Sequence, residues 1–166
     1  MECSPYALAD NLLANLLVHL DKTRAGAVSR AHVVSHTNYA VEFCPMAVVA
    51  VGSMKPVQVQ RGGCGPFVWD LALTIGVHRC FPTHEHGAAP SPVEVDSAAR
   101  DILDDGEAMR RAVGDAFDDD EYQVVEWRTL PPQGGSHGST MQVTVRVSWG
   151  SFVEPRSGML PGDPRG

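Results

Sequence analysis

The chain has 166 residues, of which 43% are hydrophobic and 20% charged, a composition typical of folded globular proteins rather than disordered ones. The formal net charge of −7 argues against a general nucleic-acid-binding protein, because phosphate contact depends on clustered lysine and arginine. The sequence contains no apolar run of 18 residues and begins without a basic stretch, so neither a membrane span nor a secretory signal is predicted. We expect one domain over residues 1–150 and an extended or disordered tail over residues 151–166.

The four cysteines are widely spaced and form no Cys-x-x-Cys pair. This pattern predicts buried free thiols in a reducing compartment, with a zinc site or disulfide bonds as less favoured alternatives. The cysteines are Cys3, Cys44, Cys64 and Cys80.

Leucines at spacings of three and four between Leu8 and Leu20 form one apolar stripe and predict an amphipathic helix. Ser4 and Pro5 suit its start, and Gly26 lies just past its expected end. The stripe is too short for a leucine zipper, so we expect this helix to lie on a sheet.

The next part of the chain is less regular. Residues 28–34 and 39–43 could each form a short extended segment, whereas residues 47–51 and 57–60 look more like strands. Residues 62–66 are rich in glycine but lack the lysine and hydroxyl side chain of a phosphate loop. We therefore expect a hairpin loop there.

The most regular pattern covers residues 67–80, where a large apolar side chain occupies every second position. Such alternation places these side chains on one face of a strand, and its length places the strand at the centre of a sheet. The other face carries small and polar residues, which we expect a neighbouring subunit to approach closely. These residues are Asp70, Ala72, Thr74 and Gly76.

A second helix is predicted to begin at Ser91, because Pro92 suits the first helical position and Glu94 completes a capping box. Gly106 lies on its apolar side and could permit close approach to another backbone. The acidic residues 118–121 are expected to end the helix as a solvated turn rather than bind a cation. The apolar side comprises Val95, Ala98, Ala99, Ile102, Leu103, Met109, Ala112, Val113, Ala116 and Phe117.

Two further strands are predicted over residues 122–129 and 140–149, separated by a Gly-rich loop over residues 130–139. The expected fold class is therefore α+β, with a largely antiparallel (mixed) sheet and two helices packed on one face. The expected core comprises Leu12, Leu16, Leu71, Leu73, Ile75, Ile102, Leu103, Val143, Val145 and Val147.

No catalytic constellation is predicted, because nothing assembles a nucleophile, a base and an orienting group. The best chemical cluster is His78, Cys80, His84 and His86, which has the donor types of a zinc site but no recognised ligand spacing. We expect unliganded surface histidines, no catalytic residue, no cofactor and no metal.

Several segments together resemble the small neck proteins of long-tailed actinobacterial phages, usually labelled head-to-tail connector or tail terminator. These segments are the leucine-rich first helix, WDLALTIGVHRCFP, SPVEVDSAARDI and EWRTLPPQGGSHGSTMQVTVRVSW. The turn PQGG-x-x-GS before the last strand is the most specific of them. The order of elements is similar to that of the tail-terminator fold, and the resemblance covers roughly residues 8–149.

The resemblance implies a structural virion protein, a tail terminator that forms a homo-oligomeric ring, expected to be a hexamer. Such a ring caps the tail tube protein and docks on the head connector or stopper, while genomic DNA passes through the lumen without specific binding. The protein would lie in the virion neck, and in the host cytoplasm during assembly. Contacts between subunits or with partners are expected from Asp70, Thr74, His78, Gln133, His137, Arg146 and Arg156.

Three alternatives stay open at this point. One is a stopper or adaptor ring at another level of the neck. Another is a small metal-dependent enzyme built on the His/Cys cluster, and the third is a monomeric binding module. If the ring interpretation holds, residues 61–66, residues 130–139 and the tail should contact other subunits or neck partners.

Overall fold

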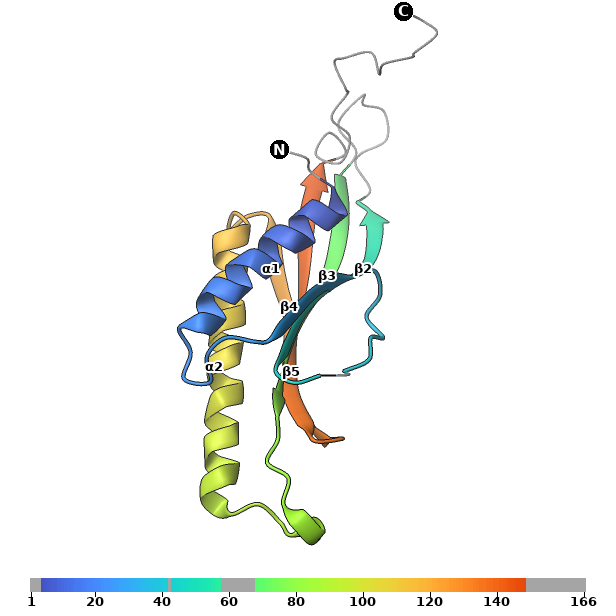
Figure 1. Cartoon of the computed structure of the whole chain (residues 1–166). Helices are drawn as coiled ribbons and strands as arrows, with labels where there is room; N and C mark the ends of the chain where they lie inside the picture. The colour runs from blue at the N-terminus through green and yellow to red at the C-terminus, as the bar shows by residue number, and fades with distance from the viewer. Residues whose placement is uncertain (1–3, 42, 58–67, 149–166) are drawn as a thin grey trace, which may run out of the picture.

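The computed structural model describes residues 4–41, 43–57 and 68–148. Five strands form one sheet in the order β1-β2-β3-β5-β4, in which β1 pairs with β2 in parallel and every other pairing is antiparallel. Both helices lie on the same side of this sheet (Figure 1). The predicted α+β class with a mixed sheet is therefore confirmed. The elements are α1 Pro5–Asp21, β1 Arg30–Val34, β2 Met46–Pro56, β3 Val68–Cys80, a 3-10 turn Glu85–Gly87, α2 Pro92–Ala116, β4 Tyr122–Gln133 and β5 Ser136–Ser148.

The first helix begins as predicted and ends sooner. Ser4 caps it by accepting a hydrogen bond from the Ala7 N–H at 3.0 Å. It ends at Asp21 rather than close to Gly26. The reason is a compact turn in which Thr23 donates its hydroxyl to the Leu20 carbonyl at 2.7 Å and accepts the Gly26 N–H at its own carbonyl.

The second helix has the predicted capping box: the Glu94 N–H donates to Ser91 Oγ, and the Glu94 carboxylate accepts the Ser91 N–H. Its predicted apolar side was too wide. Leu103 is 59% exposed and Val95 48% exposed, whereas Ile102 is buried. Successive residues turn by about 100° around a helix, so Leu103 points away from the sheet when its neighbour Ile102 faces it.

The core lies between the helices and the sheet. β3 is the central strand, and its Leu73 and Ile75 pair across to Val143 and Met141 of β5. Except for Leu103, the predicted core residues are buried, and we therefore remove only that residue from the core. The confirmed members are Leu12, Leu16, Leu71, Leu73, Ile75, Ile102, Val143, Val145 and Val147.

Between the first helix and β3, residues 39–41 and 43 do not form a strand, and β2 is a single strand of 11 residues. Gly52 does not interrupt it, because the ladder with β3 shifts register between Val51 and Met54 and absorbs the irregularity. The strand expected at residues 57–60 and the loop at 62–66 lie essentially outside the described residues, as does the tail over 151–166.

The expected loop over residues 130–139 is instead the end of a β-hairpin. β4 and β5 continue to Gln133 and Ser136, joined by a two-residue turn at Gly134 and Gly135. Both glycines have positive φ, 61° and 77°, which such a tight turn requires and glycine adopts without steric cost. Prolines are tolerated in β4 because it is an edge strand.

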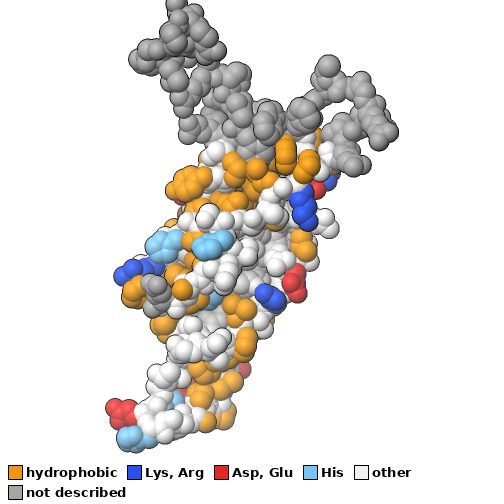
Figure 2. Space-filling model, turned by 90° about the vertical axis from the view of Figure 1, so that its right-hand side faces the viewer, with side chains coloured by type: hydrophobic (Ala, Val, Ile, Leu, Met, Phe, Trp, Pro, Cys, Tyr) orange, Lys and Arg blue, Asp and Glu red, His pale blue; other side chains and the backbone are white. Residues whose placement is uncertain are grey.

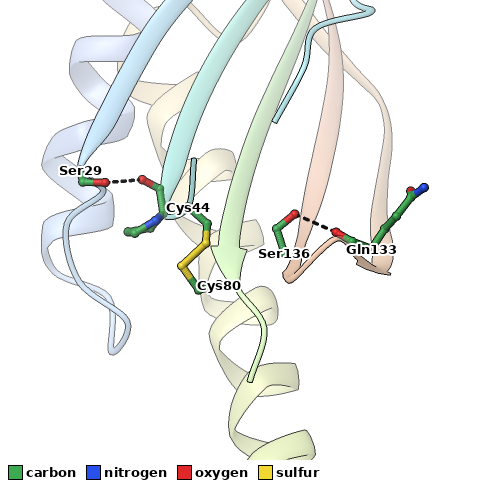
Figure 3. The surroundings of a disulfide bond; sticks show 6 residues. Ser29, Cys44, Cys80, Gln133 and Ser136 are labelled. Carbon is green, nitrogen blue, oxygen red and sulfur yellow. Dashed lines mark hydrogen bonds between the residues drawn. A yellow bond between two sulfur atoms is a disulfide. The ribbon is translucent and has the colours of Figure 1, made fainter. Parts of the chain in front are cut away.

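Cys44 and Cys80 form a disulfide bond, so the prediction of free thiols was wrong for this pair (Figure 3). The two residues are 36 positions apart, which hides their proximity in the sequence. The sheet brings them together because Met46, just after Cys44, pairs with His78, just before Cys80. Cys3 and Cys64 lie outside the described residues.

Within the described part of the chain, no helix is both long and apolar enough to cross a membrane.

Candidate functional site

The sheet has one face covered by helices and one that is only partly covered. On the second face, Ala72 and Thr74 of β3 lie between Gln142 and Thr144 of β5 on one side and β2 on the other. A shallow hollow of about 460 Å³ lies over these residues and reaches Val125 of β4. We call this region the open face. The surface in Figure 2 carries few charged side chains among many hydrophobic and uncharged polar ones.

One ion pair borders the open face. Asp70 of β3 and Arg146 of β5 are register partners, and the guanidinium binds the carboxylate through two contacts, Nε–Oδ1 at 3.0 Å and Nη2–Oδ2 at 3.3 Å. The hydrogen bond from Arg146 to Asp70 raises the pKa of that guanidinium. The two charges of this pair compensate each other, and Asp120 and Glu121 line the same depression.

The other part of the second face is covered by the chain itself. Tyr39, in the connection between β1 and β2, lies over β3 with its hydroxyl 2.9 Å from Nε2 of His78. A side chain at Gly76 would collide with the Tyr39 hydroxyl, so only glycine permits this cover. Burial raises the pKa of Tyr39 to about 12 and lowers the pKa of His78 to about 4.

The predicted contact residues are therefore not gathered in one place. Asp70, Thr74 and Arg146 border or line the open face. The expectation that His78 and Gly76 offer a surface to a neighbour was wrong, because both are buried beneath their own chain.

Of the remaining predicted contact residues, Gln133 is exposed at the hairpin end, where its carbonyl accepts a hydrogen bond from Ser136 (Figure 3). His137 is not available to a partner in this structure, since only 8% of it is exposed and its ring packs edge-on against Phe81. Burial lowers the pKa of His137. Arg156 lies outside the described residues.

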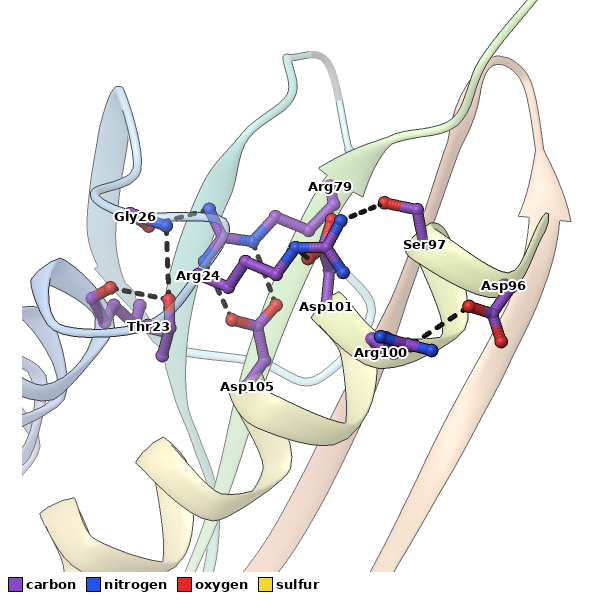
Figure 4. Close-up of polar contacts among 10 residues, drawn as sticks. Thr23, Arg24, Gly26, Arg79, Asp96, Ser97, Arg100, Asp101 and Asp105 are labelled. Carbon is purple, nitrogen blue, oxygen red and sulfur yellow. Dashed lines mark hydrogen bonds and ion pairs between the residues drawn. The ribbon is translucent and has the colours of Figure 1, made fainter. Parts of the chain in front are cut away.

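A buried ion pair links α2 to the sheet (Figure 4). Arg79 donates to Asp105 through Nε at 2.9 Å and Nη2 at 2.7 Å, and its Nη1 donates to the Gly26 carbonyl at 2.9 Å. Burial raises the pKa of Asp105, and the hydrogen bonds from Arg79 oppose that shift. Both side chains are enclosed, so this pair positions elements rather than meeting a ligand.

Sequence reasoning missed this pair, although two signals were present. Arg79 continues the alternation of β3 on the helix-covered face, and Asp105 lies three positions after Ile102 on the buried side of α2. A charged residue in each of two facing apolar patterns indicates a buried pair.

The histidine and cysteine cluster does not form a metal site. His78 binds Tyr39, Cys80 is in the disulfide, and His84 contacts a Glu94 carboxylate oxygen at 3.0 Å. Across the described ranges, no group of three or more His, Cys, Asp or Glu side chains could hold a metal ion.

A second surface feature lies beside β1 and was not predicted. An apolar groove of about 830 Å³ is lined by Tyr6 of α1, Val33 and Val34 of β1, and Met54 of β2. Tyr6 is 64% exposed and Met54 42% exposed, which is unusual for large apolar side chains that lie together. We call this feature the β1 groove.

No known family model matches this chain, and no curated protein matches it in sequence.

Proposed function

We propose that this protein is a structural virion protein, a tail terminator whose copies form a ring that caps the tail tube and joins it to the head connector. The open face is the observation that carries the proposal. Ala72 and Thr74 project little from the sheet, and a hollow of about 460 Å³ lies above them. Small side chains on the central strand, between β2 and β5, allow the backbone of another molecule to approach the sheet closely.

The hairpin with the PQGG-x-x-GS motif adds support. The motif forms the tight end of the β4–β5 hairpin, so the part of the sequence that most resembles phage neck proteins is a defined structural element. In Figure 1 this hairpin extends past α1, at the end of the sheet opposite the start of β3 and the end of β5. An element in that position can reach a neighbouring ring without disturbing the core.

The disulfide is consistent with a protein that works in a released particle. Disulfide bonds are rare in the reducing cytosol but persist on virions and cell surfaces. We infer that Cys44 and Cys80 are thiols during assembly in the host and form the disulfide after release, when oxygen in the medium accepts the two electrons and two protons. The net charge of −7 also suits a ring through which DNA passes without binding.

Mass measurement of the purified protein, alone and with the tail tube protein, is the first test. We expect a discrete species whose mass is a whole multiple of 17.8 kDa, with six copies as the expected number. A monomer under both conditions would contradict the proposal and favour a monomeric binding module.

Complementation then tests the role in the neck. A phage that lacks its own copy should accumulate unjoined heads and tails, and the wild-type protein should restore joining. Ala72→Arg should fail to restore it, because a long charged side chain fills the open face, whereas Leu103→Arg on the exposed side of α2 should succeed. A terminator should copurify with isolated tails; copurification with heads alone would instead indicate a stopper or adaptor.

A further inference from the structure

Resting on the proposed function, we infer that the contact between neighbouring subunits joins the β4 edge of one copy to the β1 groove and β1 edge of the next. β1 and β4 are the two end strands of the sheet, and within the described residues neither outer edge pairs with another strand. A contact between two different edges is heterologous, which is the type that generates rings.

The strand directions suit this pairing. β4 runs parallel to β3, because both are antiparallel to β5, while β1 runs opposite to β3, because it is parallel to β2. If adjacent copies keep similar orientations, β4 of one copy therefore meets β1 of the next in antiparallel alignment. The start of β4 then lies beside the end of β1.

The two edges have opposite charge. β1 carries Arg30 and no acidic residue, and exposed histidines lie at position 32 and, just past its end, at position 36. Residues 118–127, which lead into β4, contain five acidic residues and no basic one. Arg30 and Glu126 are both exposed and both project on the face away from the helices. Opposite charge at the two edges favours a head-to-tail contact and disfavours contact between two identical edges.

Apolar groups are matched in the same alignment. Val124 and Val125, near the start of β4, are 39% and 57% exposed, and paired valines on a free edge strand are an aggregation hazard unless a partner covers them. The β1 groove, with its exposed Tyr6 and Met54, lies at the end of β1. Antiparallel contact therefore brings the two valines to the groove, and both apolar surfaces are removed from water.

Charge reversal tests the contact in the full-length protein. Arg30→Glu and Glu126→Arg should each require roughly tenfold or more protein for half-maximal ring formation, because each places like charges together, and the double variant should recover much of the loss. Arg100→Glu, on an exposed position near the start of α2, is the control and should assemble like the wild type. Arg30 also stacks on Phe43 at 3.8 Å, so thermal melts must show that each variant is folded.

A mixing experiment does not depend on Arg30. Val124→Arg changes the β4 edge on the face that the helices cover, outside the open face, and Tyr6→Asp changes the β1 groove. Each variant alone should be monomeric, and an equimolar mixture should stop at dimers, because each dimer retains one intact contact and two blocked surfaces. Ring formation by either folded variant at wild-type concentrations would overturn the contact but leave the proposed function standing. A wild-type protein that stays monomeric, alone and with the tail tube protein, would overturn both.

Discussion

Tyr39 and His78 are 39 residues apart in the sequence, yet the Tyr39 hydroxyl lies 2.9 Å from His78 Nε2 on the second face of the sheet. Their rings meet edge to face with centroids 5.6 Å apart. This contact, the glycine at position 76 and the nearby Cys44–Cys80 disulfide hold the connection between β1 and β2 against the sheet. They thereby divide that face into a covered part and the open face.

His78 should make stability depend on pH. Burial lowers its pKa from 6.5 to about 4, so the folded state keeps the ring neutral where the unfolded chain binds a proton. The free energy of unfolding therefore has its full value above pH 6.5. It falls by about 3 kcal/mol in total as the pH decreases toward 4, because the unfolded chain then binds a proton that the folded state does not. The measurement is the free energy of unfolding by denaturant from pH 7 to pH 4.5. His78→Gln should have a shallower slope over this range; equal slopes would show that His78 does not cause the effect.

Replacing Gly106 by alanine should destabilise the protein, although Gly106 lies inside a helix, where alanine is usually favoured. A Cβ there would lie 2.8–2.9 Å from ring atoms of Trp127, so Gly106→Ala forces the helix or the indole to move. We expect destabilisation of about 1–3 kcal/mol, as for overpacked cores. Gly114→Ala is the matched control in the same helix: its nearest contact is the Tyr122 hydroxyl at 3.7 Å, and helix propensity should stabilise it by about 0.5–1 kcal/mol. The opposite order of unfolding midpoints would contradict the Trp127 contact.

Replacing Leu73 and Leu103 compares the same substitution at a core position and at a surface position. Leu73 is 1% exposed and Leu103 is 59% exposed. Leu73→Ala should cost about 2–5 kcal/mol, because it leaves a cavity between the sheet and the helices. Leu103→Ala should change the unfolding free energy by less than about 0.5 kcal/mol. Chemical denaturation of both variants checks this, and a stable Leu73→Ala protein would place the core elsewhere.

The disulfide should stabilise the oxidised protein. Closing a loop between cysteines 36 positions apart restricts the unfolded chain, and Cys44→Ser should therefore cost about 3–4 kcal/mol under oxidising conditions. Dithiothreitol should lower the melting temperature of the wild type and leave that of the Cys44→Ser/Cys80→Ser double variant unchanged. Alkylation before and after reduction, followed by peptide mass analysis, checks that these two cysteines are the bonded pair.

Local signals in the sequence determined much of the secondary structure. The capping box at Ser91 and Glu94 and the alternation in β3 act through neighbouring residues, so they were visible without the fold. The apolar faces also predicted most of the core. A strand whose apolar residues recur every second position, or a helix in which they recur about every 3.6 positions, has a single face to bury. Leu103 was wrongly predicted to be in the core, because the spacing of apolar residues in a helix shows which side is buried but not how wide the buried strip is.

Only the tertiary structure decided which distant residues meet. The Cys44–Cys80 bond, the Arg79–Asp105 pair and the contact of Tyr39 with His78 each depend on strand register or on the position of a helix over the sheet. Local patterns place Arg79 and Asp105 on buried faces, but they do not say which residues meet, because that depends on the order of the strands and on where the helix lies over the sheet. The extent of the open face was decided in the same way: strand alternation predicted a face of small residues, but the cover provided by Tyr39 determined how much of it stays exposed.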